Sequence, residues 1–234
     1  MSVQLPLTMR WPAQQRFDTY VADGNGAAVD ALARAAAEPN PWIFLSGAAG
    51  VGKTHLLFAA CARASEAKRS AQYLSLKKLG NDRAAAIRAF GGSAFVAIDD
   101  VDAIAGDAAC EHALFDLFNR LKADASTVVF AATASPAQLG IALPDLVSRL
   151  SSSAQIALKP LGDDARREAV RQRAGARGIE LDNAVIDWMF EHTPRDLGSL
   201  AALIERIDRE SLAAKRRITV PFLRKLTGGR IANR

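Results

Sequence analysis

Short apolar runs alternate with helical patterns along the first two thirds of the chain. The apolar runs have the length of strands and cover residues 42–46, 72–76, 95–98, 127–132 and 155–158. The helical patterns cover residues 26–37, 55 onward, 82–90, 110–122 and 143–150. Strands and helices that alternate in this way predict an α/β fold, in which helices cover both faces of a parallel sheet.

The pattern changes after residue 160, where strand-like runs stop. Amphipathic segments at residues 163–177, 182–192, 195–214 and 219–227 predict helices. We expect Asp163, Asp182 and Thr219 to cap helix N-termini, and Gly178 to end the first of these helices. The chain therefore divides into a predicted flexible tail at residues 1–12, an α/β core at 13–160 and a helical subdomain at 161–234.

The composition indicates a soluble globular protein. Half of the 234 residues are apolar, which is enough for a sizeable core and excludes a disordered chain. The apolar runs are too short to span a membrane, and the N-terminus lacks the pattern of a signal peptide. Cys61 and Cys110 stand singly in helical patterns, so we expect buried free thiols. The sequence thus predicts a cytoplasmic protein with no membrane contact.

The excess of positive charge lies mainly in the last third of the chain. The formal net charge is +5, and residues 161–234 contribute +4 of it, with 15 Lys and Arg against 11 Asp and Glu. Most of these charges alternate in sign on predicted helices, as at residues 163–168, which include Arg166 and are typical of a solvated face. The compact basic cluster at residues 215–217 either contacts DNA or stabilises a helix end through the helix dipole.

The segment after the first apolar run matches the phosphate-binding loop pattern G-x-x-x-x-G-K-[ST]. Its residues are Gly47, Ala48, Ala49, Gly50, Val51, Gly52, Lys53 and Thr54, followed by His55. Glycines and compact residues let successive backbone N–H groups face one centre, at which the next helix aims its positive end. We expect Lys53 to bind the β- and γ-phosphates, and the Thr54 hydroxyl to bind Mg²⁺. The loop therefore predicts a site for a nucleoside phosphate with Mg²⁺.

Two carboxylates follow the apolar run at residues 95–98. We expect Asp99 to orient Mg²⁺ through its water shell, and Asp100 to polarise an attacking water. Adjacent Asp residues after a strand are also common in helix N-caps. Their occurrence some way after a phosphate loop favours a Walker B element, the acidic strand end of such nucleotide sites.

Three further polar residues each have a functional and a structural interpretation. Thr133 follows the run at residues 127–132, and it either contacts the γ-phosphate or caps the turn before Pro136. Arg149 ends a short helix, where it either reaches the nucleotide of a neighbouring molecule or serves only solubility. Arg195 either couples closure of the helical subdomain to the nucleotide or pairs with nearby acids.

These motifs, in this order, resemble the AAA+ ATPases of the DnaA clade. The resemblance rests on residues 17–21, the phosphate loop, Asp99-Asp100, Ser148-Arg149 and Arg195-Asp196-Leu197, and it spans residues 17–227. It implies an AAA+ core with a helical lid, and ADP or ATP with Mg²⁺ as cofactors. It also implies that Thr133 is sensor 1, Arg195 is sensor 2, and Arg149 is an arginine finger that acts in trans. Related proteins have Asp or Asn at the place of Thr133, and because a hydroxyl orients water less firmly, we expect weak or no intrinsic ATP hydrolysis.

The N-terminal tail resembles a peptide that docks on the bacterial sliding clamp. Gln4, Leu5 and Leu7 match the Q-L-x-L pattern, although such short strings arise by chance and Thr8 replaces the usual aromatic residue. A DnaA-like core with this tail, and without the DNA-binding domain of DnaA, resembles the Hda family of DnaA regulators. The resemblance implies DnaA and the β sliding clamp of DNA polymerase III as partners, self-association, and DNA contact that is weak or passes through the clamp. It also implies a cytoplasmic location, on the nucleoid through the clamp.

Two functions from different classes fit these features. In the first, the clamp-bound protein promotes hydrolysis of ATP bound to DnaA and so prevents re-initiation of replication. In the second, the chain is an ATP-driven helicase loader or remodeller that binds single-stranded DNA, since Lys53, Asp99 and Asp100 are all present. A third, simpler class is a nucleotide-stabilised scaffold. The tail peptide and the resemblance to Hda favour the first function.

Overall fold

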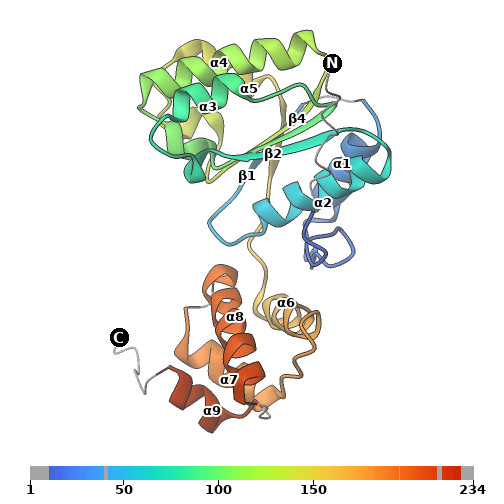
Figure 1. The fold of residues 1–234 in the computed structure, drawn as a ribbon, viewed down its shortest axis with the longest axis vertical. Coiled ribbons are helices and arrows are strands. Elements are labelled where there is room, and N and C mark those ends of the chain that lie inside the picture. The colour runs from blue at the N-terminus through green and yellow to red at the C-terminus, as the bar shows by residue number, and fades with distance from the viewer. Residues whose placement is uncertain (1–10, 40–41, 195, 215–217, 228–234) are drawn as a thin grey trace, which may run out of the picture.

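A five-stranded parallel sheet forms the centre of the first two thirds of the chain (Figure 1). The computed structural model describes residues 11–39, 42–194, 196–214 and 218–227, without the side chains of 211–214. The tail residues Gln4, Leu5 and Leu7, as well as Arg195 and the basic cluster at 215–217, therefore lie outside the described residues.

The strands follow the predicted runs to within one residue at each end. They are β1 (Ile43–Ser46), β2 (Ala71–Ser75), β3 (Phe95–Asp99), β4 (Thr127–Ala132) and β5 (Ala154–Ala157). Their order in the sheet is β2-β3-β4-β1-β5, and every neighbouring pair is parallel. The predicted α/β fold is thus confirmed.

Helices cover both faces of the sheet, as the alternation of strands and helices predicts. One face carries α1 (Gly26–Ala37) and α2 (Lys53–Glu66), and the other carries α3 (Arg83–Ala89), α4 (Ala108–Ala123) and α5 (Pro144–Ser151). Because successive side chains of a strand point to opposite faces, Phe44 and Phe130 pack under α3–α5, whereas Leu45 and Val129 pack under α1 and α2.

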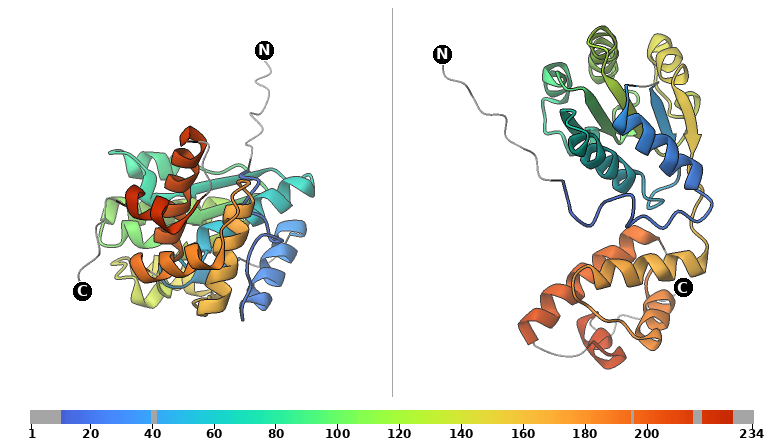
Figure 2. Two further views of the ribbon diagram at one scale, coloured as in Figure 1. Left: turned by 90° about the horizontal axis from the view of Figure 1, so that it is seen from below. Right: turned by 90° about the vertical axis from the view of Figure 1, so that its right-hand side faces the viewer.

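The last third forms a separate helical subdomain, the lid. It contains α6 (Asp163–Gly175), α7 (Asn183–His192), α8 (Leu197–Ala214) and α9 (Val220–Leu226), which share a hydrophobic core of their own. Figures 1 and 2 show the lid beyond one end of the sheet, joined to β5 by an extended segment.

Two of the three predicted helix caps are confirmed. The side chain of Asp182 accepts the N–H of Val185, and that of Thr219 accepts the N–H of Phe222. The prediction for Asp163 is wrong, because the helix begins one residue earlier than expected and Gly162 is its N-cap. The Gly162 N–H donates to Asp23 Oδ2 at 2.8 Å, and this contact with the core fixes the chain where it enters α6.

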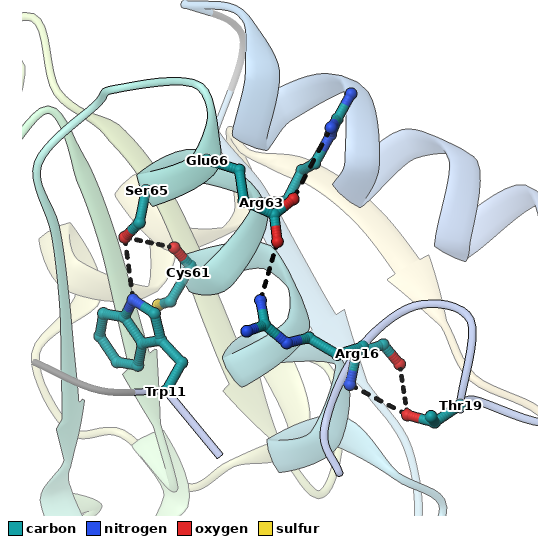
Figure 3. Close-up of polar contacts among 7 residues, drawn as sticks. All are labelled: Trp11, Arg16, Thr19, Cys61, Arg63, Ser65 and Glu66. Atoms are coloured by element: carbon teal, nitrogen blue, oxygen red, sulfur yellow. Dashed lines mark hydrogen bonds and ion pairs between the residues drawn. The ribbon is translucent and has the colours of Figure 1, made fainter. Parts of the chain in front are cut away.

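Residues 11–20, the N-terminal strap, lie along α2 (Figure 3). Trp11 Nε1 donates to Ser65 Oγ at 2.9 Å, and Arg16 forms a 2.9 Å ion pair with Glu66. The Thr19 hydroxyl accepts the N–H of Arg16 at 3.0 Å and closes the loop of the strap. These contacts attach the strap to α2, the helix that follows the phosphate loop.

Cys61 and Cys110 are free thiols and both are buried, as predicted. Burial raises the pKa of the Cys61 thiol well above its ordinary value, and raises that of Cys110 to about 11. Within the part of the chain that the structure describes, no helix is both long and apolar enough to cross a membrane.

Candidate nucleotide site

The predicted phosphate loop connects the end of β1 with the start of α2. Gly50 and Gly52 have positive φ angles of 77° and 99°, which residues with a Cβ rarely adopt. A Cβ added to Gly52 would lie 2.7 Å from Cε2 of Tyr20, closer than side-chain carbons approach. Both positions therefore require glycine, so that the backbone can curl around a ligand.

Lys53 lies over the loop that precedes it. Its Nζ donates hydrogen bonds to the backbone oxygens of Gly47 at 2.6 Å and Ala48 at 3.0 Å. Burial lowers the pKa of the ammonium, while the nearby carboxylates of Asp99, Asp102 and Asp100 act in the opposite direction. The ammonium is thus held at the centre of the loop, where phosphate oxygens would be its counter-ions.

The Walker B carboxylate Asp99 meets the loop directly. Thr54 Oγ1 donates to Asp99 Oδ2 at 2.6 Å, and the Tyr73 hydroxyl donates to the same oxygen at 2.9 Å. Asp99 is only 1% exposed, and burial raises its pKa, although the hydrogen bonds from Thr54 and Tyr73 lower it. The two residues predicted to serve Mg²⁺, Thr54 and Asp99, are therefore in contact.

Asp100 and Thr133 are each held by a residue outside the predicted set. The Ser75 hydroxyl donates to Asp100 Oδ2 at 2.6 Å, and Asp100 itself has a left-handed backbone, with φ at 58°. The exposed residue Thr133 donates its backbone N–H to Asp102 Oδ1 at 3.0 Å. The Walker B segment is in this way connected to the ends of both neighbouring strands, β2 and β4.

These residues fit a nucleotide with Mg²⁺. Mg²⁺ is usually bound through one or two protein groups together with waters and phosphate oxygens, which matches the pair Thr54 and Asp99. Among the described residues, no group of three or more Asp, Glu, His or Cys side chains gathers to hold a metal alone. The phosphates would therefore supply the remaining ligands, and the bound ion would neutralise their charge.

A cavity of about 290 Å³ opens between the loop and the lid. It is lined by Ala48, Ala49, Gly50, Val51, Pro160, Leu161, Arg166, Asp196 and Leu197. Arg166, one of the alternating charges at residues 163–168, thus also faces this cavity, which the charge pattern did not predict. The missed signal is its position in the first turn of the helix that directly follows the last strand.

His55, predicted to bind the cofactor, contacts the N-terminal strap. Its Nε2 lies 2.8 Å from the backbone oxygen of Arg16, and its ring packs edge-on against Tyr20 at 5.4 Å between centroids. Burial lowers the pKa of His55, so the ring is neutral near pH 7. The Tyr20 hydroxyl in turn donates to the Val51 oxygen at 3.3 Å, and this bond ties the strap to the phosphate loop.

Arg149 lies near the amino ends of the strands, whereas the phosphate loop lies at their carboxyl ends. Ala154, three residues after α5 ends, pairs with Ile43 at the start of β1, whereas Gly47 follows the end of β1. The length of the strand, about 13 Å for four residues, separates the two places. The Arg149 side chain is exposed, and its guanidinium carbon lies 6.0 Å from the centroid of the Phe118 ring.

The sequence contains only part of the signal for two positioning residues in β2. Tyr73 and Ser75 are two apart on a strand, so they point to the same side, and Ser75 is in register with Asp99. The signal is thus a pair of hydroxyl side chains at the end of a predicted strand. It was missed because only the strand order shows that β2 lies beside β3.

The sheet order, the phosphate loop and the Walker B contact define the class as a P-loop nucleotide-binding protein of the AAA+ type. Residues 13–158 match the family described as the bacterial DnaA ATPase domain, and residues 163–226 match the Hda lid domain. The chain therefore belongs to the DnaA ATPase family and carries an Hda lid. This combination is that of a DnaA-inactivating regulator of replication initiation, in agreement with the resemblance in its motifs.

Solved structures share this fold. Domain III of the replication initiation protein DnaA from Thermotoga maritima superposes with a TM-score of 0.79 at 22% identity, covering 96% of this chain and 100% of that one. AMPPCP-bound DnaA from Aquifex aeolicus gives a TM-score of 0.65 at 22% identity, covering 88% and 71%. A mutant of RuvB from Thermotoga maritima gives 0.66 at 19% identity, covering 94% and 72%. At these identities the likeness concerns the fold alone.

Proposed function

We propose that this chain, docked on the sliding clamp through Gln4, Leu5 and Leu7, promotes hydrolysis of the ATP bound to DnaA. Conversion of DnaA to its ADP form would then prevent re-initiation of replication. The chain would meet its partner on the nucleoid, where the clamp is loaded on DNA. Self-association would place the same arginine against a second copy of the chain and would compete with DnaA.

The position of Arg149 is the observation that carries this proposal. The residue is exposed and lies at the opposite end of the strands from the chain's own phosphate loop. It would therefore not reach a nucleotide bound at that loop. A guanidinium placed at a partner's γ-phosphate stabilises the charge that develops during hydrolysis. Arg149 would therefore serve as an arginine finger in trans.

The chain's own nucleotide, ADP or ATP with Mg²⁺, would have a structural role in this proposal. It would be held by the phosphate loop with Thr54 and Asp99, and it would set the relation between core and lid. Asp100 is held by Ser75, and Thr133 offers only a hydroxyl as sensor 1, so these two side chains would orient water poorly. Arg195, as sensor 2, would complete the lid side of the site.

Single-turnover phosphate release from ATP-bound DnaA, with and without clamp loaded on DNA, tests the function. We expect Arg149→Ala to lose stimulation by a factor of about 10³ to 10⁵, the range found for removal of an arginine finger. Arg34→Ala is a matched control, since Arg34 is also an exposed arginine in the last turn of a helix but lies on α1. Unchanged stimulation by Arg149→Ala would refute the finger assignment.

Clamp docking is tested separately by changing Gln4 and Leu5 to Ala. The two substitutions remove an apolar anchor and a hydrogen-bonding amide, so we expect clamp binding to be lost while the unfolding temperature stays the same. Thr8→Ala, in the same tail, should bind the clamp as the unmodified chain does. Clamp binding that survives the double substitution would contradict the docking proposal. DNA-stimulated ATP turnover without DnaA would instead favour the helicase loader.

A further inference from the structure

Arg166, in the first turn of α6, lines the nucleotide cavity from the side of the lid. The opposite wall is the phosphate loop, where Ala48 and Gly50 face the same cavity. Core and lid approach closely here, since a Cβ added to Gly50 would lie 3.4 Å from the backbone nitrogen of Leu197, the first residue of α8. The cavity is thus bounded by the loop on one side and by Arg166 on the other.

The Arg166 guanidinium is held in place by an ion pair that does not occupy all of its N–H donors. Its Nη1 donates to Asp163 Oδ1 at 2.9 Å, in an ion pair between the first and fourth residues of α6, and the side chain is 25% exposed. A guanidinium has five N–H donors in a planar fork that matches the oxygens of a phosphate. The pair with Asp163 therefore orients the fork and leaves donors for a ligand.

The other charged residue in the cavity wall, Asp196, is committed to the lid. Its Oδ1 accepts the N–H of Ser199 at 2.8 Å in the first turn of α8, and hydrogen bonds from Ser199 lower its pKa. Lys53, two residues after Val51 in the cavity wall, provides the cation of the core, and its Nζ donates to the Gly47 oxygen. A nucleotide whose phosphates extend from the cavity to Lys53 would meet one cation from the lid and one from the core, an arrangement that suits several phosphate charges on one molecule.

We propose that Arg166 binds a phosphate of the nucleotide and thereby ties the lid to the phosphate loop. The proposal rests on the proposed occupancy of the loop by a nucleoside di- or triphosphate. Because the contact is to a phosphate, loss of Arg166 weakens the binding of ADP and leaves the binding of the base and ribose in place. The relation between core and lid then depends on the phosphates that are bound.

Equilibrium binding of ADP and of adenosine to the full chain tests this inference. In Arg166→Ala, we expect the affinity for ADP to fall about 10- to 100-fold, as for the loss of a charge-assisted hydrogen bond, with the affinity for adenosine unchanged. Arg166→Lys keeps the charge but not the planar fork, so its affinity for ADP should lie between that of the unmodified chain and that of Arg166→Ala.

Arg167→Ala is the matched control, because the side chain of Arg167 packs against α7 of the lid. It forms an ion pair with Asp187 and lies 4.8 Å over the ring of Phe190. This variant should bind ADP as the unmodified chain does. Thermal unfolding without ligand checks that each variant folds, and Arg166→Gln, which keeps the bulk of the side chain, replaces Arg166→Ala if that variant is unstable.

Two results would overturn the inference: unchanged affinity of Arg166→Ala or Arg166→Gln for ADP, or equal losses for ADP and adenosine. If the unmodified chain binds no ADP, the proposed occupancy of the loop fails, and this inference fails with it. If it binds ADP and Arg166 has no effect, only the inference about Arg166 fails. Neither result depends on the action of the chain on DnaA.

Discussion

At the scale of single residues, hydrogen bonds offset part of the cost of burying the Asp99 carboxylate, which we propose to serve Mg²⁺. Burial disfavours its ionised form, but Oδ2 accepts hydrogen bonds from Thr54 and Tyr73, and Oδ1 accepts the backbone N–H of Asp100 at 2.9 Å. Each bond favours the carboxylate over the acid. The Tyr73 ring is itself fixed by stacking on Phe58, with 4.3 Å between the centroids.

Tyr73→Phe should raise the Mg²⁺ concentration needed for half-maximal ADP binding by about two- to tenfold. The change removes one hydrogen bond to Asp99, worth about 0.5–1.5 kcal/mol, and retains the ring that stacks on Phe58. Titration of Mg²⁺ at fixed ADP measures the shift. Binding of ADP in the absence of Mg²⁺ serves as the internal control and should not change. An identical Mg²⁺ requirement would show that Tyr73 does not position Asp99.

At the scale of elements, one buried carboxylate holds the segment that leads into α5. Glu111, on α4, is 1% exposed and accepts the backbone N–H groups of Gly106 at 2.7 Å, Ala142 at 3.0 Å and Leu143 at 2.8 Å. These donors belong to two loops, so a single side chain of α4 fixes the place where α5 begins. The helix that carries Arg149 is thus positioned from its N-terminal end.

Glu111→Gln should destabilise the chain by about 2–3 kcal/mol in urea unfolding. The amide keeps the shape of the side chain but loses the charge, and it turns an NH₂ group toward backbone donors that then lack an acceptor. Hydrogen exchange should become faster at residues 106, 142 and 143. Glu180→Gln, at an exposed position on the lid, is the control and should change neither quantity. Unchanged exchange at residue 143 would contradict this account.

At the scale of the whole molecule, the phosphate loop and Arg149, the proposed arginine finger, lie at opposite ends of the strands of one sheet. The phosphate loop follows the end of β1, whereas Arg149 precedes the start of β5, which pairs with the start of β1. Residues this far apart, with no shared contact partner, usually act additively. In the proposed function, the chain would therefore hold its own nucleotide at one end of the strands and act on a partner at the other.

Lys53→Ala and Arg149→Ala should therefore affect different measurements. Lys53→Ala removes the cation at the centre of the loop, so we expect its affinity for ADP to fall at least about tenfold. Arg149→Ala should bind ADP like the unmodified chain. ADP at a concentration that saturates the unmodified chain should accordingly raise the unfolding temperature of Arg149→Ala. The same concentration should raise that of Lys53→Ala much less. A loss of ADP affinity in Arg149→Ala would show that Arg149 and the phosphate loop are coupled.

Local patterns allowed most of the fold to be predicted from the sequence. Strand and helix positions depend on the spacing of apolar residues, and the caps at Asp182 and Thr219 depend on a side chain and a backbone group three residues later. The phosphate loop is equally local, since its glycines are needed within one turn of the backbone. The cap predicted at Asp163 was wrong because a distant residue, Asp23, fixes the entry to α6.

The sequence by itself thus determined the α/β class, the helical lid, the phosphate loop and the Walker B pair, because each follows from interactions between residues close along the chain. Tertiary structure alone decided which groups from distant segments meet. Strand order brings Tyr73 to Asp99 and Asp102 to Thr133, and the placement of the lid brings Arg166 to the loop. These pairings depend on how whole elements pack, which no local pattern specifies.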